Sequence, residues 1–326
     1  MIFIPFEIFT RGIGGPSTFM RDFRDYLIKE SYQFIEDINL YKEADSIFFP
    51  ISFSRNILDF FKKRKKPIIQ RLDGVFYPSK HGMKYILLNW EIKKDYLNYS
   101  DFIIFQSNFS KLECFTIMGE IPQEKYKIIY NGTDKSIFKP SLKVFNENKI
   151  IFATTGAFRN IDMIEPVVLA LDEINKNYDI ELRIIGPIIN KEINKFTCRS
   201  YIKYLGAKNK IQLGEELGKI DILIHCQLNP ACPNSVIEAI SCGVPVVGFD
   251  TGAMKEIVNF APELLACVSN EIFQKYKDFK YNKLLEKIVL CIENYKKYKK
   301  IFLNNSYLYN SDNCFKEYLK IFDSLN

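Results

Sequence analysis

Short apolar runs alternate with amphipathic stretches along most of this chain. Runs of four or five residues that are mainly apolar are typical of strands buried on both faces of a parallel sheet. They occupy residues 46–50, 67–70, 102–105, 149–153, 181–185, 221–225 and 245–248. The stretches between them, such as 54–61, 83–97 and 163–175, have helical spacing. This alternation predicts an α/β fold with parallel sheets covered by helices.

The strand-like runs fall into two series that are separated near residues 131–148. This segment contains Asn131-Gly132, Pro140 and a polar run at 146–148, a composition typical of an inter-domain connection. We therefore expect two doubly wound domains. In such folds ligands bind outside the carboxyl ends of the strands, so we expect a ligand site in the crevice between the domains.

Composition limits the classes of partner. The 326 residues are 47% hydrophobic, which is enough for two packed cores, and the net charge is +6. This mild basicity suits phosphate-bearing ligands or an anionic membrane surface, but it does not indicate nucleic acid binding. The basic run 62–66 is most simply a solvated helix end, with a weak membrane-surface patch as the alternative.

The cysteines and the first residues bear on location and metals. Eight scattered cysteines without a CxxC pair, together with only two histidines, predict no metal site and reduced thiols. Residues 1–6 have the pattern of a core strand rather than a signal peptide, and no apolar run reaches the roughly 18 residues that span a bilayer. We expect a cytoplasmic protein, with the inner face of a membrane as the alternative.

The stretch 229–248 carries the clearest candidate chemistry. Pro233, Asn234 and Ser235 predict a helix start, with Asn234 or Ser235 as the N-cap and amides available to a phosphate or sugar oxygen. Glu238 follows one turn later in an apolar run. Its carboxylate could accept two hydrogen bonds from the diol of a nucleotide ribose. The alternative is a capping box in which Ser235 and Glu238 only satisfy backbone amides.

Two glycine turns are candidate phosphate sites. Gly14 and Gly15 follow the first strand and precede a helix, where amides can bind an anion; a ligand-free tight turn is equally compatible. Gly156 and Arg159 follow the first strand of the second series. Arginine suits bidentate contacts to a diphosphate, although a surface arginine at a helix start is the alternative.

Two further strand ends carry ionisable residues. Asp73 ends a strand of the first series, where it could orient an acceptor hydroxyl or act as a base, or simply form a turn before Gly74. His225 ends a strand beside the 229–248 stretch. It could line a donor pocket, but a histidine whose hydrogen bonds are satisfied is the reading that we favour.

These motifs together resemble those of the GT-B glycosyltransferases of family 4. The resemblance lies in 131–134 with 138–140, in 232–239, in 242–247 and in 251–258, and more weakly in the Gly14-Gly15 loop. It implies two facing Rossmann-like domains: 1–140 on the acceptor side, joined by a returning helix within 307–326, and 147–306 on the side of the nucleotide sugar.

The resemblance also implies an activity and roles for residues. It implies transfer of a sugar from a nucleotide-sugar donor to a hydroxyl acceptor (a glycan, a lipid-linked molecule or a small molecule) with retention of configuration, no required metal and no cofactor. Glu238 would contact the donor ribose, and Gly14 and Gly15 would face its phosphates. Charge on the departing diphosphate would be stabilised by Arg159 and by helix N-termini.

Two positions depart from the family's pattern. The first acid of the E-x7-E motif is replaced by Pro230, and the phosphate-binding Gly-Arg and Lys pair is reduced to Arg159 after Ala157. Two other interpretations therefore stay open. One is a protein that binds a sugar nucleotide or glycan without turnover, and the other is a nucleotide-sugar epimerase on the same scaffold.

Overall fold

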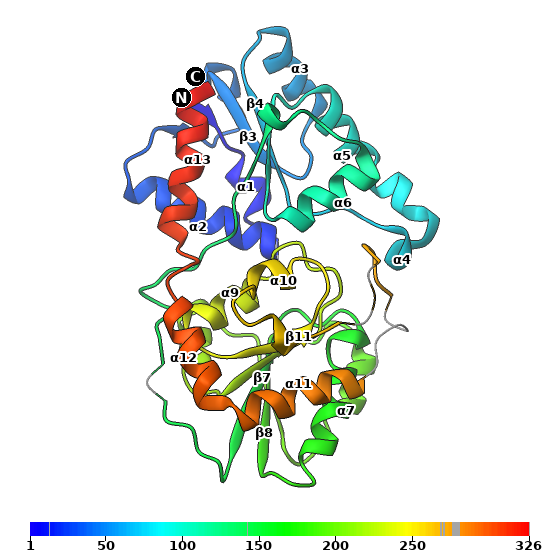
Figure 1. Ribbon diagram of the computed structural model, residues 1–326. Helices are drawn as coiled ribbons and strands as arrows, with labels where there is room; N and C mark the ends of the chain where they lie inside the picture. The colour runs from blue at the N-terminus through cyan, green and yellow to red at the C-terminus, as the bar shows by residue number, and fades with distance from the viewer. Residues whose placement is uncertain (13, 142, 268, 270, 276–280, 326) are drawn as a thin grey trace. The chain divides into compact units, whose positions relative to one another are not determined.

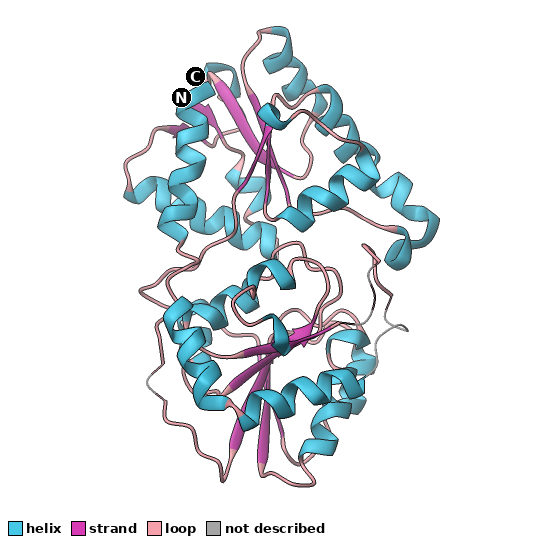
Figure 2. Ribbon diagram, in the orientation of Figure 1, coloured by secondary structure: helices cyan, strands magenta, loops and turns pink. Residues whose placement is uncertain are grey.

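Two six-stranded sheets, both entirely parallel, form the framework of the protein (Figure 2). The computed structural model describes residues 1–12, 14–141, 143–267, 269, 271–275 and 281–325. The first sheet has the strand order β2-β1-β3-β4-β5-β6, and the second has the order β12-β11-β10-β7-β8-β9. The predicted α/β class with parallel, helix-covered sheets is confirmed.

The strands have the following bounds. Those of the first sheet are β1 (Ile2–Phe3), β2 (Phe34–Ile35), β3 (Ser46–Pro50), β4 (Ile68–Leu72), β5 (Phe102–Phe105) and β6 (Tyr126–Ile128). Those of the second are β7 (Ile150–Thr155), β8 (Ile180–Ile185), β9 (Ile202–Gly206), β10 (Ile222–His225), β11 (Val246–Phe249) and β12 (Leu265–Ala266). The apolar runs at 46–50 and 102–105 coincide with β3 and β5, because strands buried on both faces leave a continuous apolar signature.

The chain divides into two compact units. The first comprises Met1–Asn131 and Ser311–Asn326, and the second comprises Gly132–Asn310. Most of the segment expected to connect the domains, 131–148, thus belongs to the second unit. There the Thr133 hydroxyl lies 2.7 Å from the Ser241 hydroxyl, and the Thr133 amide donates to the carbonyl of Tyr309.

The first unit is covered by seven helices in the described residues, and the last of them comes from the end of the chain. They are α1 (Phe6–Phe9), α2 (Gly15–Lys29), α3 (Arg55–Lys63), α4 (Pro78–His81), α5 (Tyr85–Asn98), α6 (Asn108–Met118) and α13 (Ser311–Leu325). Helix α13 packs beside α2 (Figure 1). Its Phe315, Tyr318 and Phe322 join Phe19 and Phe23 in one buried aromatic cluster, in which each ring pair contributes about 0.5–1.5 kcal/mol beyond burial.

In the second unit, helices follow the strands in turn. They are α7 (Glu165–Ile174), α8 (Lys210–Leu217), α9 (Asn234–Ser241), α10 (Met254–Ile257), α11 (Tyr281–Glu293) and α12 (Tyr295–Asn305). Helix α9 ends as predicted at Gly243, which has φ +64°. A β-carbon there would lie 2.5 Å from the Leu303 side chain of α12. None of the described helices combines the length and apolar content that crossing a bilayer requires.

Candidate functional site

Helix α9 begins one residue earlier than the sequence suggested. Its N-cap is Pro233, and no side chain caps it, so the prediction of Asn234 or Ser235 as N-cap is wrong. The reason is local: proline fixes φ in the range that a helix start needs, and the Pro233 carbonyl accepts from the amides of Val236 and Ile237. The capping box is excluded as well, because Ser235 lies inside the helix.

Glu238 lies one turn into α9, half-buried among neighbours that are fully buried. Its negative charge acts on the Cys242 thiol at the end of the helix: burial raises the pKa of Cys242 to about 12, and Glu238 adds to this rise. Contact of Glu238 with a ribose stays a prediction.

His225, at the carboxyl end of β10, is buried directly beside the start of α9. Its Nδ1 lies 3.3 Å from the Ser235 hydroxyl, whereas its Nε2 has no hydrogen-bond partner among the described residues. Burial lowers the pKa of His225 to about 4, so the ring is neutral near pH 7. The expectation of a histidine whose hydrogen bonds are satisfied thus holds at Nδ1 but not, among the described residues, at Nε2. Sequence reasoning could place His225 at a strand end but could not see that one nitrogen remains unpaired.

The loop between β10 and α9 is held by the turn that follows β11. Buried Pro230 accepts a hydrogen bond from the Ala253 amide at 2.8 Å, and a β-carbon on Gly252 would come within 2.5 Å of Pro230. Asn229, with φ +48°, exchanges hydrogen bonds with Thr251. At the position where the family resemblance leads one to expect an acid, the chain thus has a buried proline in a loop that is held by hydrogen bonds.

The turn after β7 places Gly156 and Arg159 at the same edge of the sheet. Gly156 has φ +149°, and its carbonyl approaches Gly186 so closely that a β-carbon on Gly186 would lie 1.9 Å from it. Phe158 is buried and its amide donates to the Pro187 carbonyl, whereas Arg159 is exposed. Arg159 forms no hydrogen bond or ion pair with any residue that the structure describes.

These pieces of the second unit converge because β7, β10 and β11 are adjacent parallel strands. Their carboxyl ends share one edge of the sheet, so the turn at Gly156–Arg159, the loop 226–233 and the turn at Thr251–Gly252 lie along that edge. Of the candidates in this unit, the structure thus gathers Gly156, Arg159, Pro233, Asn234, Ser235 and Glu238 around two neighbouring strand ends.

In the first unit, the glycine loop leads directly into a long helix. Gly14 is the N-cap of α2, with φ +128°, and Gly15 is its first residue. Apart from neighbouring residues of the loop and the helix's own backbone, no described atom lies within 4 Å of the positions that β-carbons would occupy on either glycine. The loop's geometry is therefore that of an open helix start, as an anion site requires.

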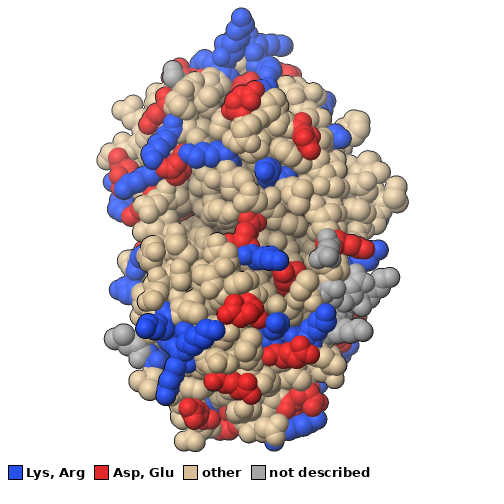
Figure 3. Space-filling model, viewed as in Figure 1, with Lys and Arg blue, Asp and Glu red and all other residues tan. Residues whose placement is uncertain are grey.

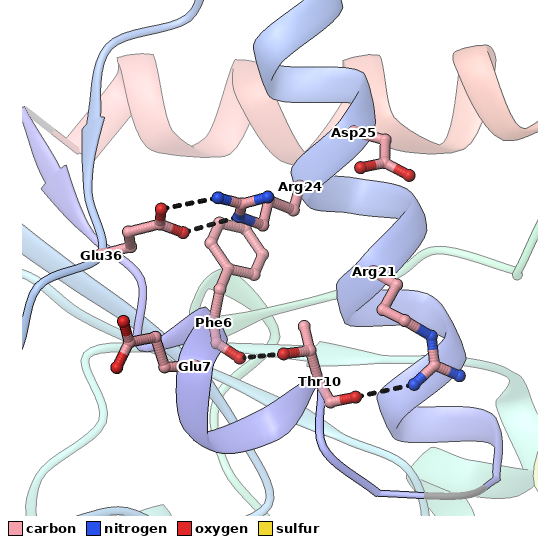
Figure 4. A pocket seen from close by; sticks show the side chains of 7 residues that line it. All are labelled: Phe6, Glu7, Thr10, Arg21, Arg24, Asp25 and Glu36. Atoms are coloured by element: carbon pink, nitrogen blue, oxygen red, sulfur yellow. Dashed lines mark hydrogen bonds and ion pairs between the residues drawn. The ribbon is translucent and has the colours of Figure 1, made fainter.

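Arg21, which the sequence reasoning did not single out, lies in the second turn of α2 and holds this loop by hydrogen bonds. Its guanidinium donates to the carbonyls of Thr10 at 2.7 Å and Gly12 at 3.2 Å. Thr10 and Arg21 also line a hollow of ≈ 400 Å³ with Phe6, Glu7, Arg24, Asp25 and Glu36 (Figure 4). In it Arg24 forms a bidentate pair with Glu36, which lowers the pKa of Glu36.

Asp73 belongs to a closed set of buried polar groups at the end of β4. Its Oδ1 accepts hydrogen bonds from Arg71 and from Gln106 Nε2, and its side chain is 10% exposed. Its Oδ2 accepts no hydrogen bond from the described residues. Asp73 is thus more than a turn aspartate, since it is the carboxylate that pairs with the fully buried Arg71.

The guanidinium of Arg71 contacts three side chains from other segments of the chain. It donates to the Tyr318 hydroxyl of α13 at 3.1 Å and to Asn131 Oδ1 at 3.0 Å, and it stacks on the Phe19 ring of α2 at 3.8 Å. Asn131 in turn donates to Gln106 at 2.8 Å. A buried arginine with its hydrogen bonds satisfied in this way fixes the position of Asp73.

Comparison with known proteins agrees with this architecture. The family model described as "Glycosyl transferases group 1" matches residues 148–275. The structure resembles sucrose-phosphate synthase from Thermosynechococcus elongatus, with a TM-score of 0.76, 12% identity, and coverage of 99% of this chain and 98% of that one. The chain has the GT-B fold. WaaG, a GT-B glycosyltransferase involved in lipopolysaccharide biosynthesis, is similar with a TM-score of 0.68 and 12% identity, over 98% of this chain and 99% of that one.

Two further proteins are similar to this chain. HepE of Anabaena, solved in complex with UDP-glucose, matches with a TM-score of 0.65 and 16% identity over 88% of this chain and 80% of that one. The N-acetyl-alpha-D-glucosaminyl L-malate synthase of Bacillus anthracis is 20% identical over 177 residues, 48% of this chain. The match spans only 46% of that curated relative. Among the described residues of this GT-B chain, no group of three His, Cys, Asp or Glu is placed to hold a metal ion.

Proposed function

We propose that this protein is a retaining glycosyltransferase of the family 4 type, which transfers a sugar from a nucleotide-sugar donor to a hydroxyl acceptor. The observation that carries the proposal is the match of the group 1 glycosyltransferase model to residues 148–275. That range includes Gly156, Arg159 and Glu238, whose strand ends share one edge of the second sheet.

The second unit would bind the donor. Glu238 would accept hydrogen bonds from the ribose hydroxyls, and the amides at the start of α9 would bind an oxygen of the donor. Arg159 would pair with the diphosphate, since it is exposed and its charge is not compensated by any described carboxylate. Gly156 would leave room for the phosphates. As the family resemblance implies, Gly14 and Gly15 at the start of α2 would also face the donor phosphates.

The first unit would orient the acceptor. Asp73 would accept a hydrogen bond from an acceptor hydroxyl. Its Oδ1 is held by Arg71 and Gln106, whereas its Oδ2 is buried and has no hydrogen-bond partner among the described residues, so an acceptor would have to displace the side chains that cover Oδ2. An acceptor that is a glycan, a lipid-linked molecule or a small molecule would meet this requirement equally. In the cytoplasm, the location that we expect for this protein, the nucleotide-sugar donor would be within its reach.

The chemical step would follow a front-face course. The bond between the sugar's anomeric carbon and the diphosphate oxygen breaks, and a new bond forms from the same carbon to the acceptor oxygen. The proton of the acceptor hydroxyl passes to the departing diphosphate on the same face. Charge that develops on the diphosphate would be stabilised by Arg159 and by the helix N-termini. No protein nucleophile, metal or cofactor takes part in this course.

The replacement of the first motif acid by Pro230 favours a second candidate, a protein that binds a nucleotide sugar without turnover. An incubation of the full chain with UDP-, GDP- and ADP-sugars distinguishes the two. We expect release of the nucleoside diphosphate from one donor, more slowly in Glu238→Ala and at an unchanged rate in Glu215→Ala, an exposed glutamate of α8. Tight binding of a donor without release or transfer would support the second candidate, and an epimerised donor would identify an epimerase.

A further inference from the structure

The segment from α4 to α5 carries a concentrated set of exposed apolar side chains. In α5 and the short 3₁₀ turn before it (Gly82–Lys84), Met83 is 76% exposed, Leu87 78% and Trp90 62%. Ile86, Leu88 and Leu97 are also exposed. Residues 83, 87 and 90 recur at helical spacing and therefore form a stripe along the helix. On the face seen in Figure 3, side chains without charge predominate around α4, whereas α5 also carries the exposed Glu91, Lys93 and Lys94.

The stripe belongs to a helix that is firmly packed on its other side. Asn89, Ile92, Asp95 and Tyr96 are buried. Asn89 donates to the carbonyls of Phe76 and Tyr85 and accepts from the amide of Phe76. The exposed residues are thus displayed on a rigid element, and an apolar stripe of this kind on a packed helix marks an interaction surface.

Basic side chains surround the stripe. Lys80, Lys84, Lys93 and Lys94 are exposed, and none of them forms an ion pair within the part of the chain that the structure describes. The one exposed acid of α5, Glu91, is neutralised by Arg55 at 2.5 Å. Lysine stems can lie along an apolar surface while the ammonium groups reach outward, an arrangement that fits a negatively charged boundary between water and hydrocarbon.

The basic run 62–66 differs from these lysines because several of its side chains have partners within the protein. Lys62 pairs with Asp101 at 3.3 Å, Lys66 pairs with Asp45, and Arg64 lies over the Phe60 ring. Phe60 itself is half-buried and no exposed large apolar residue lies within the run. The membrane contact that the sequence left open as the alternative for this run therefore has better support at α5.

We propose that the exposed stripe Met83–Leu87–Trp90 and its lysines form a docking surface for an anionic phospholipid bilayer. The apolar residues enter the headgroup region while the four lysines lie against the lipid phosphates. Both parts are needed: insertion of the apolar side chains buries hydrophobic surface area in the bilayer, and the lysines favour anionic over uncharged lipid. This docking does not depend on the sugar-transfer activity, because none of the site residues belongs to the surface.

The test uses the chain's single tryptophan, Trp90, as an internal probe. The full-length protein is mixed with vesicles of phosphatidylcholine alone or of an equal mixture of phosphatidylcholine and phosphatidylglycerol. We expect a blue shift of the Trp90 emission and co-sedimentation with the mixed vesicles only, both of which decrease as salt is raised. Equal binding to both vesicles, or no binding, would overturn the proposal.

Matched variants locate the contact. Leu87→Glu and the pair Lys93→Glu/Lys94→Glu should each weaken binding to the mixed vesicles at least about tenfold. Ile211→Glu, which alters a similarly exposed apolar residue of α8, and Lys63→Glu, in the other basic run, should leave it unchanged. If Leu87→Glu instead abolishes self-association seen by light scattering, while vesicle binding is absent in the wild type, the surface binds a second copy and the proposal fails.

Discussion

At the end of β4 in the first unit, Arg71 and Asp73 pair inside a closed set of side chains, whereas at the end of β7 in the second unit Arg159 is exposed and has no partner among the described residues. The ionisable side chain at the end of β10, His225, is buried as well, yet it is uncharged near pH 7. The first unit thus compensates its strand-end charges internally, whereas the second leaves its arginine without a partner among the described residues.

Removal of the buried arginine should have the largest effect. Arg71→Met leaves Asp73 nearly buried without its cation, so we expect the free energy of unfolding to fall by about 3–5 kcal/mol. Urea denaturation measures it. Arg199→Met, which breaks a partly exposed pair with Asp172, should cost less than about 1 kcal/mol. Equal losses in both variants would show that the internal compensation in the first unit is not what holds it together.

Glu238→Ala tests the ligand-facing side of the comparison. If Glu238 binds the donor ribose, donor affinity should fall by about 1–3 kcal/mol, because two hydrogen bonds are lost. Calorimetric titration with the preferred nucleotide sugar measures this, with Glu215→Ala as the control. A fall in melting temperature at unchanged donor affinity would instead give Glu238 a structural role.

The neutral His225 predicts a distinct pH dependence of stability. Its pKa is lowered in the folded state from 6.5 to about 4, so below pH 6.5 the unfolded chain binds more protons. Its contribution to stability is full above that pH and is lost as pH falls toward 4. Between pH 7 and pH 5 the wild type should lose about 2 kcal/mol more than His225→Gln. Parallel unfolding curves for the two proteins over this interval would contradict burial of a neutral ring.

Tyr318→Phe should have the smallest effect. It removes the hydroxyl that accepts from Arg71 but keeps the ring in the aromatic cluster, so we expect a loss of about 0.5–1.5 kcal/mol in stability. Donor affinity should not change, because Tyr318 is not among the residues that we propose to contact the donor. If Tyr318→Phe lowers stability by the same amount in the Arg71→Met background as in the wild type, the two side chains contribute independently.

The sequence predicted the central strands well and the edges poorly. Runs such as 46–50 are apolar throughout because both faces are covered, but β9 is partly exposed and β2 has only two residues, so neither has a distinctive pattern. The position of Arg159 after β7 and that of Glu238 in the helix after β10 followed from the same alternation. By contrast, the role of Arg71 depends on Tyr318, which is 247 residues away, and no local pattern reports such a pairing.

The start of α9 shows a second limit. Side-chain preferences favour asparagine and serine as N-caps, but here proline geometry at Pro233 sets the start and releases Ser235 to contact His225. Which competing local preference wins depends on neighbours that are brought together by the fold. Sequence reasoning could therefore identify these residues as a group but could not assign their contacts.

The origin of α13 has a consequence for synthesis. The second unit is continuous in the chain, from Gly132 to Asn310, so all of its residues are available once that stretch has left the ribosome. The first unit is not: Phe315, Tyr318 and Phe322 of its core are made last. Although translated first, it completes its core after the second, and until then its apolar surface on α2 requires protection from aggregation.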